Sequence, residues 1–186
     1  MMNIYEAIPV VEGERFKLRA VESEDCDDLL HVYSDKKALP FFNSDNCDGD
    51  NFYYATRERM QEALDFWKMS YENGWFARLS IVDKSLSSAI GTIELCVRVS
   101  EDAFNNMGIL RIDVRSDYEK ESMLYDIIAL IVPQISELLG CDGILTKAPI
   151  YAVERIEALQ KAGFTKSEHL LIGKTGFAYD GYWTRH

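Results

Sequence analysis

The sequence contains little cysteine and histidine, and neither residue type is arranged for metal binding or cross-linking. Four cysteines and three histidines occur among 186 residues, with no C-x-x-C pair and no two histidines close together. Zinc clusters and disulfide frameworks depend on such spacings. We therefore expect no metal site and no disulfide framework, and we expect two or three of the cysteines to be small buried hydrophobic residues.

Long apolar runs and targeting signals are also missing. No stretch approaches the roughly 18 consecutive apolar residues of a membrane span. Residues 1–6 show neither the basic region nor the apolar run of a secretory signal. We therefore expect a cytoplasmic protein that does not associate with a membrane.

Basic charge is scarce relative to acidic charge. The chain has 20 basic and 31 acidic residues, which gives a formal net charge of −11. Such a field repels nucleic acid and anionic membranes and attracts cationic partners such as amines. We expect no nucleic-acid partner, and plain solubility is the simpler alternative explanation of the acidic excess.

Hydrophobic periodicity divides the chain into alternating helices and strands. Three strands joined by short polar turns predict an antiparallel meander, and the helix that follows them predicts a crossover to a parallel strand. We therefore predict one mixed α/β domain over residues 1–186. Its sheet is mostly antiparallel, with six or seven strands and one central parallel pair, and about four helices flank it. The expected strands cover 16–21, 75–82, 89–97, 108–114, 143–147, 168–172 and 177–183, and the expected helices cover 23–33, 57–71, 123–139 and 152–162.

The long apolar helix over 123–139 contains a proline. Pro133 has no backbone N–H, so we expect it to kink or break the helix near Ala129. Gly140 is placed to end the helix.

The turn before this helix, residues 115–122, lies where a strand leads into a helix N-terminus. Free backbone N–H groups and the positive end of the helix dipole make such a junction a natural anion site. This turn has no glycine and carries the carboxylates Glu119 and Glu121. Its position indicates a phosphate-bearing cofactor, whereas its residues argue against one.

Three stretches resemble the GNAT superfamily of acyl-CoA-dependent N-acetyltransferases, and most closely the branch that acetylates ribosomal-protein N-termini. Residues 14–25, ERFKLRAVESED, are similar to the family's T-E-R-L-x-L-R opening. Residues 89–93, AIGTI, are similar to its x-I-G-x-I strand. Residues 152–164, AVERIEALQKAGF, are similar to its N-x-x-A-x-x-L-Y-x-K-x-G-F helix. The resemblance implies a GNAT-like fold and acetyl-CoA as co-substrate.

In the family, the pantetheine arm of the cofactor hydrogen-bonds along a gap between two splayed strands, and its diphosphate lies on an R/Q-x-x-G-x-G/A turn. The asparagine and tyrosine of the helix motif lie nearby. Carried over by position, the resemblance implies these cofactor-binding residues: Ile112, Asp113, Val114, Glu119, Lys120, Glu121, Ser122, Met123, Leu124, Ala152 and Leu159.

The turn departs from the family pattern. Ser122 and Leu124 stand at the two glycine positions, and Glu119 stands at the basic position. A carboxylate about 4–6 Å from a diphosphate costs roughly 1 kcal/mol or more per pair at surface dielectrics. Lys120 offsets part of this cost. A solvated turn that binds no cofactor is the alternative.

Two residues are candidates for acid–base chemistry. Gly108 replaces the family's usual acidic base and Leu159 its tyrosine, so other groups must supply these functions. Glu94, on a strand beside the expected cleft, is a candidate general base, and Tyr151 a candidate acid for the leaving thiolate. The alternatives are an exposed strand carboxylate and a rim aromatic residue.

Asp113 and His169 are further polar candidates for the site. Strand alternation should turn Asp113 toward the cleft or solvent, because its neighbours have the pattern of core residues. Nothing in the sequence around His169 favours a particular role for it.

The acceptor is expected to contact residues 41–71, which are rich in aromatic and acidic side chains. This composition suits a cationic, partly apolar amine. Two functions remain open. One is an N-acetyltransferase that moves an acetyl group from acetyl-CoA to a primary amine, either a peptide N-terminus or a small amine. The other is a catalytically degenerate GNAT-like domain that acts as a binding or regulatory module. Aromatic residues near both ends of the chain also allow a homodimer.

Overall fold

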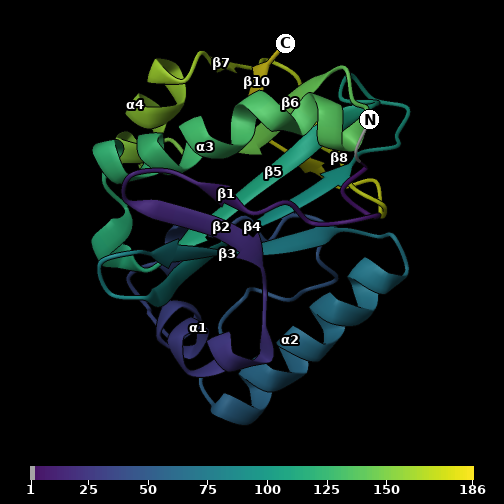
Figure 1. Cartoon of the computed structure of the whole chain (residues 1–186). Helices are drawn as coiled ribbons and strands as arrows, with labels where there is room; N and C mark the ends of the chain where they lie inside the picture. The colour runs from purple at the N-terminus through teal and green to yellow at the C-terminus, as the bar shows by residue number, and fades with distance from the viewer. Residues whose placement is uncertain (1–2) are drawn as a thin grey trace.

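The computed structural model, which describes residues 3–186, has one large sheet between two layers of helices (Figure 1). Helices α3 and α4 cover one face of the sheet, and α1 and α2 cover the other (Figure 1). Among the described residues the four helices are α1 (Cys26–Tyr33), α2 (Arg57–Glu72), α3 (Glu121–Leu139) and α4 (Val153–Lys161).

The sheet has eight strands rather than the six or seven predicted. The additional strands are short and lie at the edges, where two residues are too few to show an alternating pattern. The predicted meander and the parallel β5–β6 pair are both confirmed. The spatial order is β1 (Val11–Glu12), β2 (Phe16–Ala20), β3 (Ala77–Asp83), β4 (Ser88–Val97), β5 (Met107–Val114), β6 (Gly143–Lys147), β10 (Tyr182–Arg185) and β7 (Thr165–Lys166), and β8 (Leu171–Ile172) pairs with β9 (Ala178–Tyr179) in a separate hairpin.

Helix α3 continues through Pro133, so the expected break does not occur. Both Pro133 and Ala129 face solvent, so water can bind the Ala129 carbonyl that loses its helical partner. Gly140 ends the helix in the left-handed conformation, with φ 64°, as predicted. By length and composition α3 is apolar enough to cross a membrane, but seven of its residues are buried in this protein, as in a core helix.

The central strands are buried on both faces, and the two faces differ in polarity. Toward α3 they present an apolar surface, which includes Ile93, Leu95, Ile112 and Val114. Alternation sends the intervening residues to the α1 and α2 side, where they form a buried polar surface. Its members are Arg78, Ser80, Thr92, Glu94, Arg111 and Asp113.

Strands β5 and β6 separate soon after they pair. Parallel pairing joins only Met107, Gly108 and Ile109 to the residues from Gly143 to Leu145. The later part of β5 therefore has no strand beside it on this side. This gap corresponds to the expected cofactor position, and what fills it decides whether a cofactor fits.

Candidate functional site

A side chain from α4 fills the gap beside β5. Arg155 donates from Nε and Nη2 to the two carboxylate oxygens of Glu119, both at 2.7 Å, and from Nη1 to the backbone carbonyl of Ile112 at 2.8 Å. The Arg155 and Glu119 side chains are each only 5% exposed. The bidentate geometry is the strong form of the arginine–carboxylate pair. The carbonyl expected to bind pantetheine is therefore bonded to the protein itself.

The N-terminus of α3 is also occupied by a protein group. The Glu121 backbone N–H donates to the Glu154 carboxylate at 2.6 Å, and Lys161 Nζ lies 2.9 Å from the Glu121 carboxylate. A carboxylate is favoured at this end of a helix for the same reason as a phosphate. The Glu154 carboxylate, from α4, thus occupies the predicted anion site at the N-terminus of α3.

The residues of this region do not fit acetyl-CoA. A diphosphate at the turn would meet three carboxylates, from Glu119, Glu121 and Glu154, and a pantetheine arm would have to displace Arg155 from the Ile112 carbonyl. The other expected cofactor residues are divided between core and surface. Val114, Leu124, Ala152 and Leu159 are buried, Met123 is half-buried, and Lys120 and Ser122 are exposed.

Sequence reasoning missed Arg155, although a signal was present. The helix pattern N-x-x-A, placed on residues 152–155, has alanine where this chain has Arg155. The turn pattern has a basic residue where this chain has Glu119. Compared with the family pattern, the turn has a carboxylate in place of a basic residue, and the neighbouring helix has an arginine in place of an alanine. These two differences together indicate an ion pair.

A second polar arrangement lies on the opposite face of the sheet. Arg78, Glu94 and Arg111 are cross-strand neighbours on β3, β4 and β5. Each guanidinium donates to a different oxygen of the Glu94 carboxylate, and Glu94 is 3% exposed. Burial alone would raise the pKa of Glu94, but the guanidinium groups of Arg111 and Arg78 outweigh it and hold the pKa below its usual value. Glu94 is therefore an ionised group whose two oxygens are both engaged.

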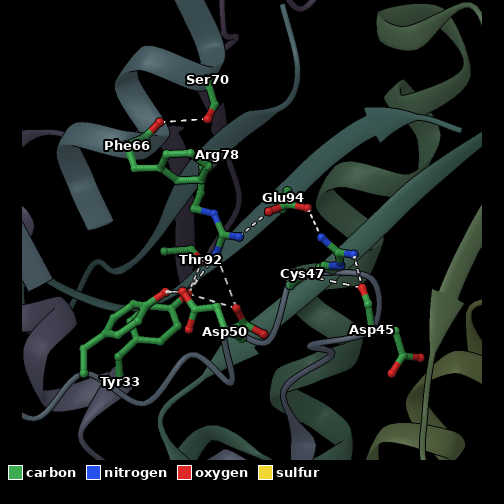
Figure 2. Close-up of polar contacts among 12 residues, drawn as sticks. Tyr33, Asp45, Cys47, Asp50, Phe66, Ser70, Arg78, Thr92 and Glu94 are labelled. Atoms are coloured by element: carbon green, nitrogen blue, oxygen red, sulfur yellow. Dashed lines mark hydrogen bonds and ion pairs between the residues drawn. The ribbon is translucent and has the colours of Figure 1, made fainter. Parts of the chain in front are cut away.

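The next row of the sheet continues this network. Tyr33 Oη donates to Asp113 Oδ2 at 2.9 Å and lies 2.7 Å from Thr92 Oγ1. Figure 2 shows Arg78 between Glu94 on one side and Thr92 and Tyr33 on the other. The expectation that Asp113 faces the cleft or solvent is wrong, because α1 and α2 cover this face and leave Asp113 2% exposed. Burial raises the pKa of Asp113.

A cavity of about 910 Å³ lies over this polar network. Its floor includes Arg78, Glu94 and Arg111, and much of its wall comes from the predicted acceptor region, including Asp50, Phe52, Tyr54, Phe66 and Trp67. Of the predicted catalytic and cofactor residues, Glu94 alone lines it. Its role as a general base stays a prediction.

One wall of the cavity includes Asn46, Cys47 and Asp48, which belong to the loop before α2. The sheet holds this loop in place. Arg111 Nη2 donates to the Asp45 carbonyl at 3.0 Å. The Asp45 carboxylate accepts from Lys147 and, at 3.0 Å, from Tyr182. These contacts join the loop to β5, β6 and β10, so the cavity is formed before any ligand arrives.

Two other candidates lie away from the cavity. The Tyr151 hydroxyl donates to the Pro40 carbonyl at 2.7 Å, and the side chain is 58% exposed beside Phe41. His169 is exposed, with its ring near Phe104. The structure does not bring Tyr151 and Glu94 together in one site.

Solved structures show that the fold is that of GNAT-family acetyltransferases. The chain is similar to ribosomal-protein-S5-alanine acetyltransferase from Vibrio fischeri, with a TM-score of 0.68 and 16% identity over 95% of this chain and 94% of that one. It is similar to a GNAT-family acetyltransferase from Bacillus anthracis, with a TM-score of 0.69 and 10% identity over 95% and 98%. It is also similar to spermidine N-acetyltransferase from Vibrio cholerae, solved with CoA and spermine, with a TM-score of 0.61 and 14% identity over 92% of each chain. No protein-family model matches the sequence, and no curated protein matches it.

Proposed function

We propose that this chain is a GNAT-fold domain that binds a small ligand in the cavity between α2 and the sheet and does not use acetyl-CoA. The observation that carries the proposal is the buried Arg155–Glu119 pair, which fills the gap beside β5. Fold likeness at this level of identity does not determine chemistry, because GNAT-like sites depend on particular side chains.

A cofactor in the gap would have to displace the Arg155–Glu119 pair. Separating a buried ion pair leaves at least one charge without a partner, at a cost of about 3–5 kcal/mol. A cofactor that entered the gap would bear this cost before gaining any contact. It would also place its phosphates near the carboxylates of Glu119 and Glu154, which repel them.

The test is a thermal-shift and calorimetric titration with acetyl-CoA and CoA. A ligand at 100 times its dissociation constant adds about 2.7 kcal/mol of stability. We expect no shift for the wild type at millimolar concentration. The matched variant Glu119→Gly/Arg155→Ala removes the pair and leaves small residues at both positions, so it should bind CoA more tightly than the wild type. Saturable stabilisation of the wild type by micromolar acetyl-CoA would overturn the proposal.

The second candidate is an N-acetyltransferase that moves an acetyl group from acetyl-CoA to a primary amine, either a peptide N-terminus or a small amine. The observation in its favour is Glu94, which lines a cavity with aromatic and acidic walls on the far side of splayed strands. The neighbour solved with CoA and spermine supports an amine acceptor. Incubation with acetyl-CoA and spermidine or an alanine-terminated peptide, with thiol release as the readout, distinguishes the two candidates. Under this second candidate, Glu94→Gln lowers turnover by roughly 100-fold or more.

A further inference from the structure

The buried arginines of this protein differ in how fully they are bonded. Arg155 uses all three of its nitrogens on protein acceptors. Arg78 and Arg111 each use only their Nη atoms, and among residues 3–186 the Nε of each has no hydrogen-bond partner. Arg78 is 3% exposed, and the Arg111 side chain is 13% exposed. Buried donors without partners are rare in folded proteins, so these two indicate an acceptor supplied from outside the chain.

Both unpartnered donors belong to side chains that line the same cavity. Arg78 and Arg111 lie on either side of Glu94 in one cross-strand row, and all three side chains form part of the cavity floor. This row carries two positive charges and one negative charge. Asp113, in the next row, lies 3.4 Å from Arg78, and burial raises its pKa. Within the row of Arg78, Glu94 and Arg111, the positive charges exceed the negative charges by one.

One part of the wall above the floor is aromatic. Trp67 stacks on the Arg78 guanidinium, whose central carbon lies 4.2 Å from the ring centroid. Phe66 and Phe76 lie with ring centroids 6.1 Å apart, and Phe66 and Trp75 are 49% and 56% exposed. The cavity volume falls in the range of roughly 300–1,000 Å³ that takes a small organic molecule.

We propose that this cavity binds a small carboxylic acid with an apolar or aromatic body. The carboxylate of the ligand accepts hydrogen bonds from the Nε–H groups of Arg78 and Arg111, and its body packs against Phe66, Trp75 and Phe76. Arginine suits this task because its guanidinium group remains charged and presents fixed donors to a planar carboxylate. The inference rests on the proposed function, because it names the ligand class of that same cavity.

The acidic residues at the rim do not reverse this preference. Asp48 and Glu101 line the cavity and are exposed, so water and salt screen their charges. Asp50 and Asp102 are paired with Arg59 and Arg98. Among the residues that line the cavity, the buried side-chain atoms without a hydrogen-bond partner are the Nε donors of Arg78 and Arg111, and donors select an acceptor. Asp113 Oδ1 is also buried without a partner, but Asp113 does not line the cavity.

The experiment compares three probes with one body: 3-phenylpropionate, 3-phenylpropanamide and 3-phenylpropylamine. Binding is followed by the fluorescence of Trp67 and Trp75 and by calorimetry. We expect the acid to bind at least 10-fold more tightly than the amide or the amine. Tighter binding of the amine, or no saturable binding of the acid at millimolar concentration, would overturn the inference.

Two variants and one control locate the contact. Arg111→Gln should weaken binding of the acid at least 10-fold, and Arg111→Lys, which keeps the charge beside Glu94 if the first variant fails to fold, should also weaken it. Lys174→Gln, at the exposed rim, should change it less than 2-fold. Unchanged binding in a folded Arg111 variant would refute the contact. Acetyl-CoA is titrated in parallel: if the acid and acetyl-CoA both bind, the inference stands and the proposed function fails.

Discussion

Replacing Arg155 with methionine removes a charge from the protein interior while keeping most of the side-chain stem. The guanidinium makes two hydrogen bonds of 2.7 Å to Glu119 and one of 2.8 Å to the Ile112 carbonyl. Without it, Glu119, which is 6% exposed, is left as a buried carboxylate with no counter-charge. Breaking a buried pair in this way costs about 3–5 kcal/mol. Urea unfolding at pH 7, followed by circular dichroism, measures the loss.

The double variant Arg155→Met/Glu119→Leu is the matched control. When both partners of a buried pair become apolar, stability is commonly unchanged or increased by about 1–4 kcal/mol. We therefore expect the double variant to recover most of what Arg155→Met loses. A single variant within about 1 kcal/mol of the wild type would show that the pair behaves like a solvated surface pair. A double variant no more stable than the single one would show that the unpaired carboxylate is not the cause.

Two further predictions concern the sheet. Burial raises the pKa of Glu94, but the opposite effect of Arg111 and Arg78 is larger. The folded-state pKa is therefore below the unfolded value of about 4.3. Its stabilising contribution is present above that value and is lost as the pH falls through the folded-state pKa. Glu94→Gln should therefore lose less stability than the wild type between pH 5 and pH 3 in urea unfolding, and an equal loss would contradict this. Gly91→Ala places a Cβ 2.2 Å from the Asp113 carbonyl oxygen, so it should destabilise by about 1–3 kcal/mol or more; a melting temperature equal to that of the wild type would contradict the close approach.

The fold was predictable where elements are long and periodic. The meander β3–β4–β5 and the crossover through α3 were recognisable because alternating and helical patterns extend over many residues there. The C-terminal part was less predictable. In place of the strands expected over 168–172 and 177–183, the structure has β8 and β9 in the small hairpin and β10 in the large sheet. Two-residue strands depend on tertiary contacts, and a local pattern does not encode them.

The polar face of the sheet shows where alternation stops being informative. Alternation along β4 predicts that Glu94 lies on the face opposite to that of Ile93 and Leu95, and the structure confirms this: Ile93 and Leu95 are in the apolar core, and Glu94 is in the polar network. Alternation could not show that α1 and α2 cover that face, so Asp113 was expected to face a cleft or solvent. Alternation separates two faces of a strand, but whether a face meets water is decided by elements elsewhere in the chain.

The cofactor gap shows a related limit. Read one position at a time, Glu119 and the absent glycines look like losses from a phosphate-binding turn. Arg155 looks like an ordinary polar residue of an amphipathic helix. Together they form a buried ion pair in which each residue depends on the other. Without Arg155, Glu119 would be a buried carboxylate with no counter-charge, and without Glu119, Arg155 would be a buried guanidinium with no counter-charge. A change at one position alone therefore leaves a buried charge without a partner, whereas a change that makes both positions apolar removes that cost.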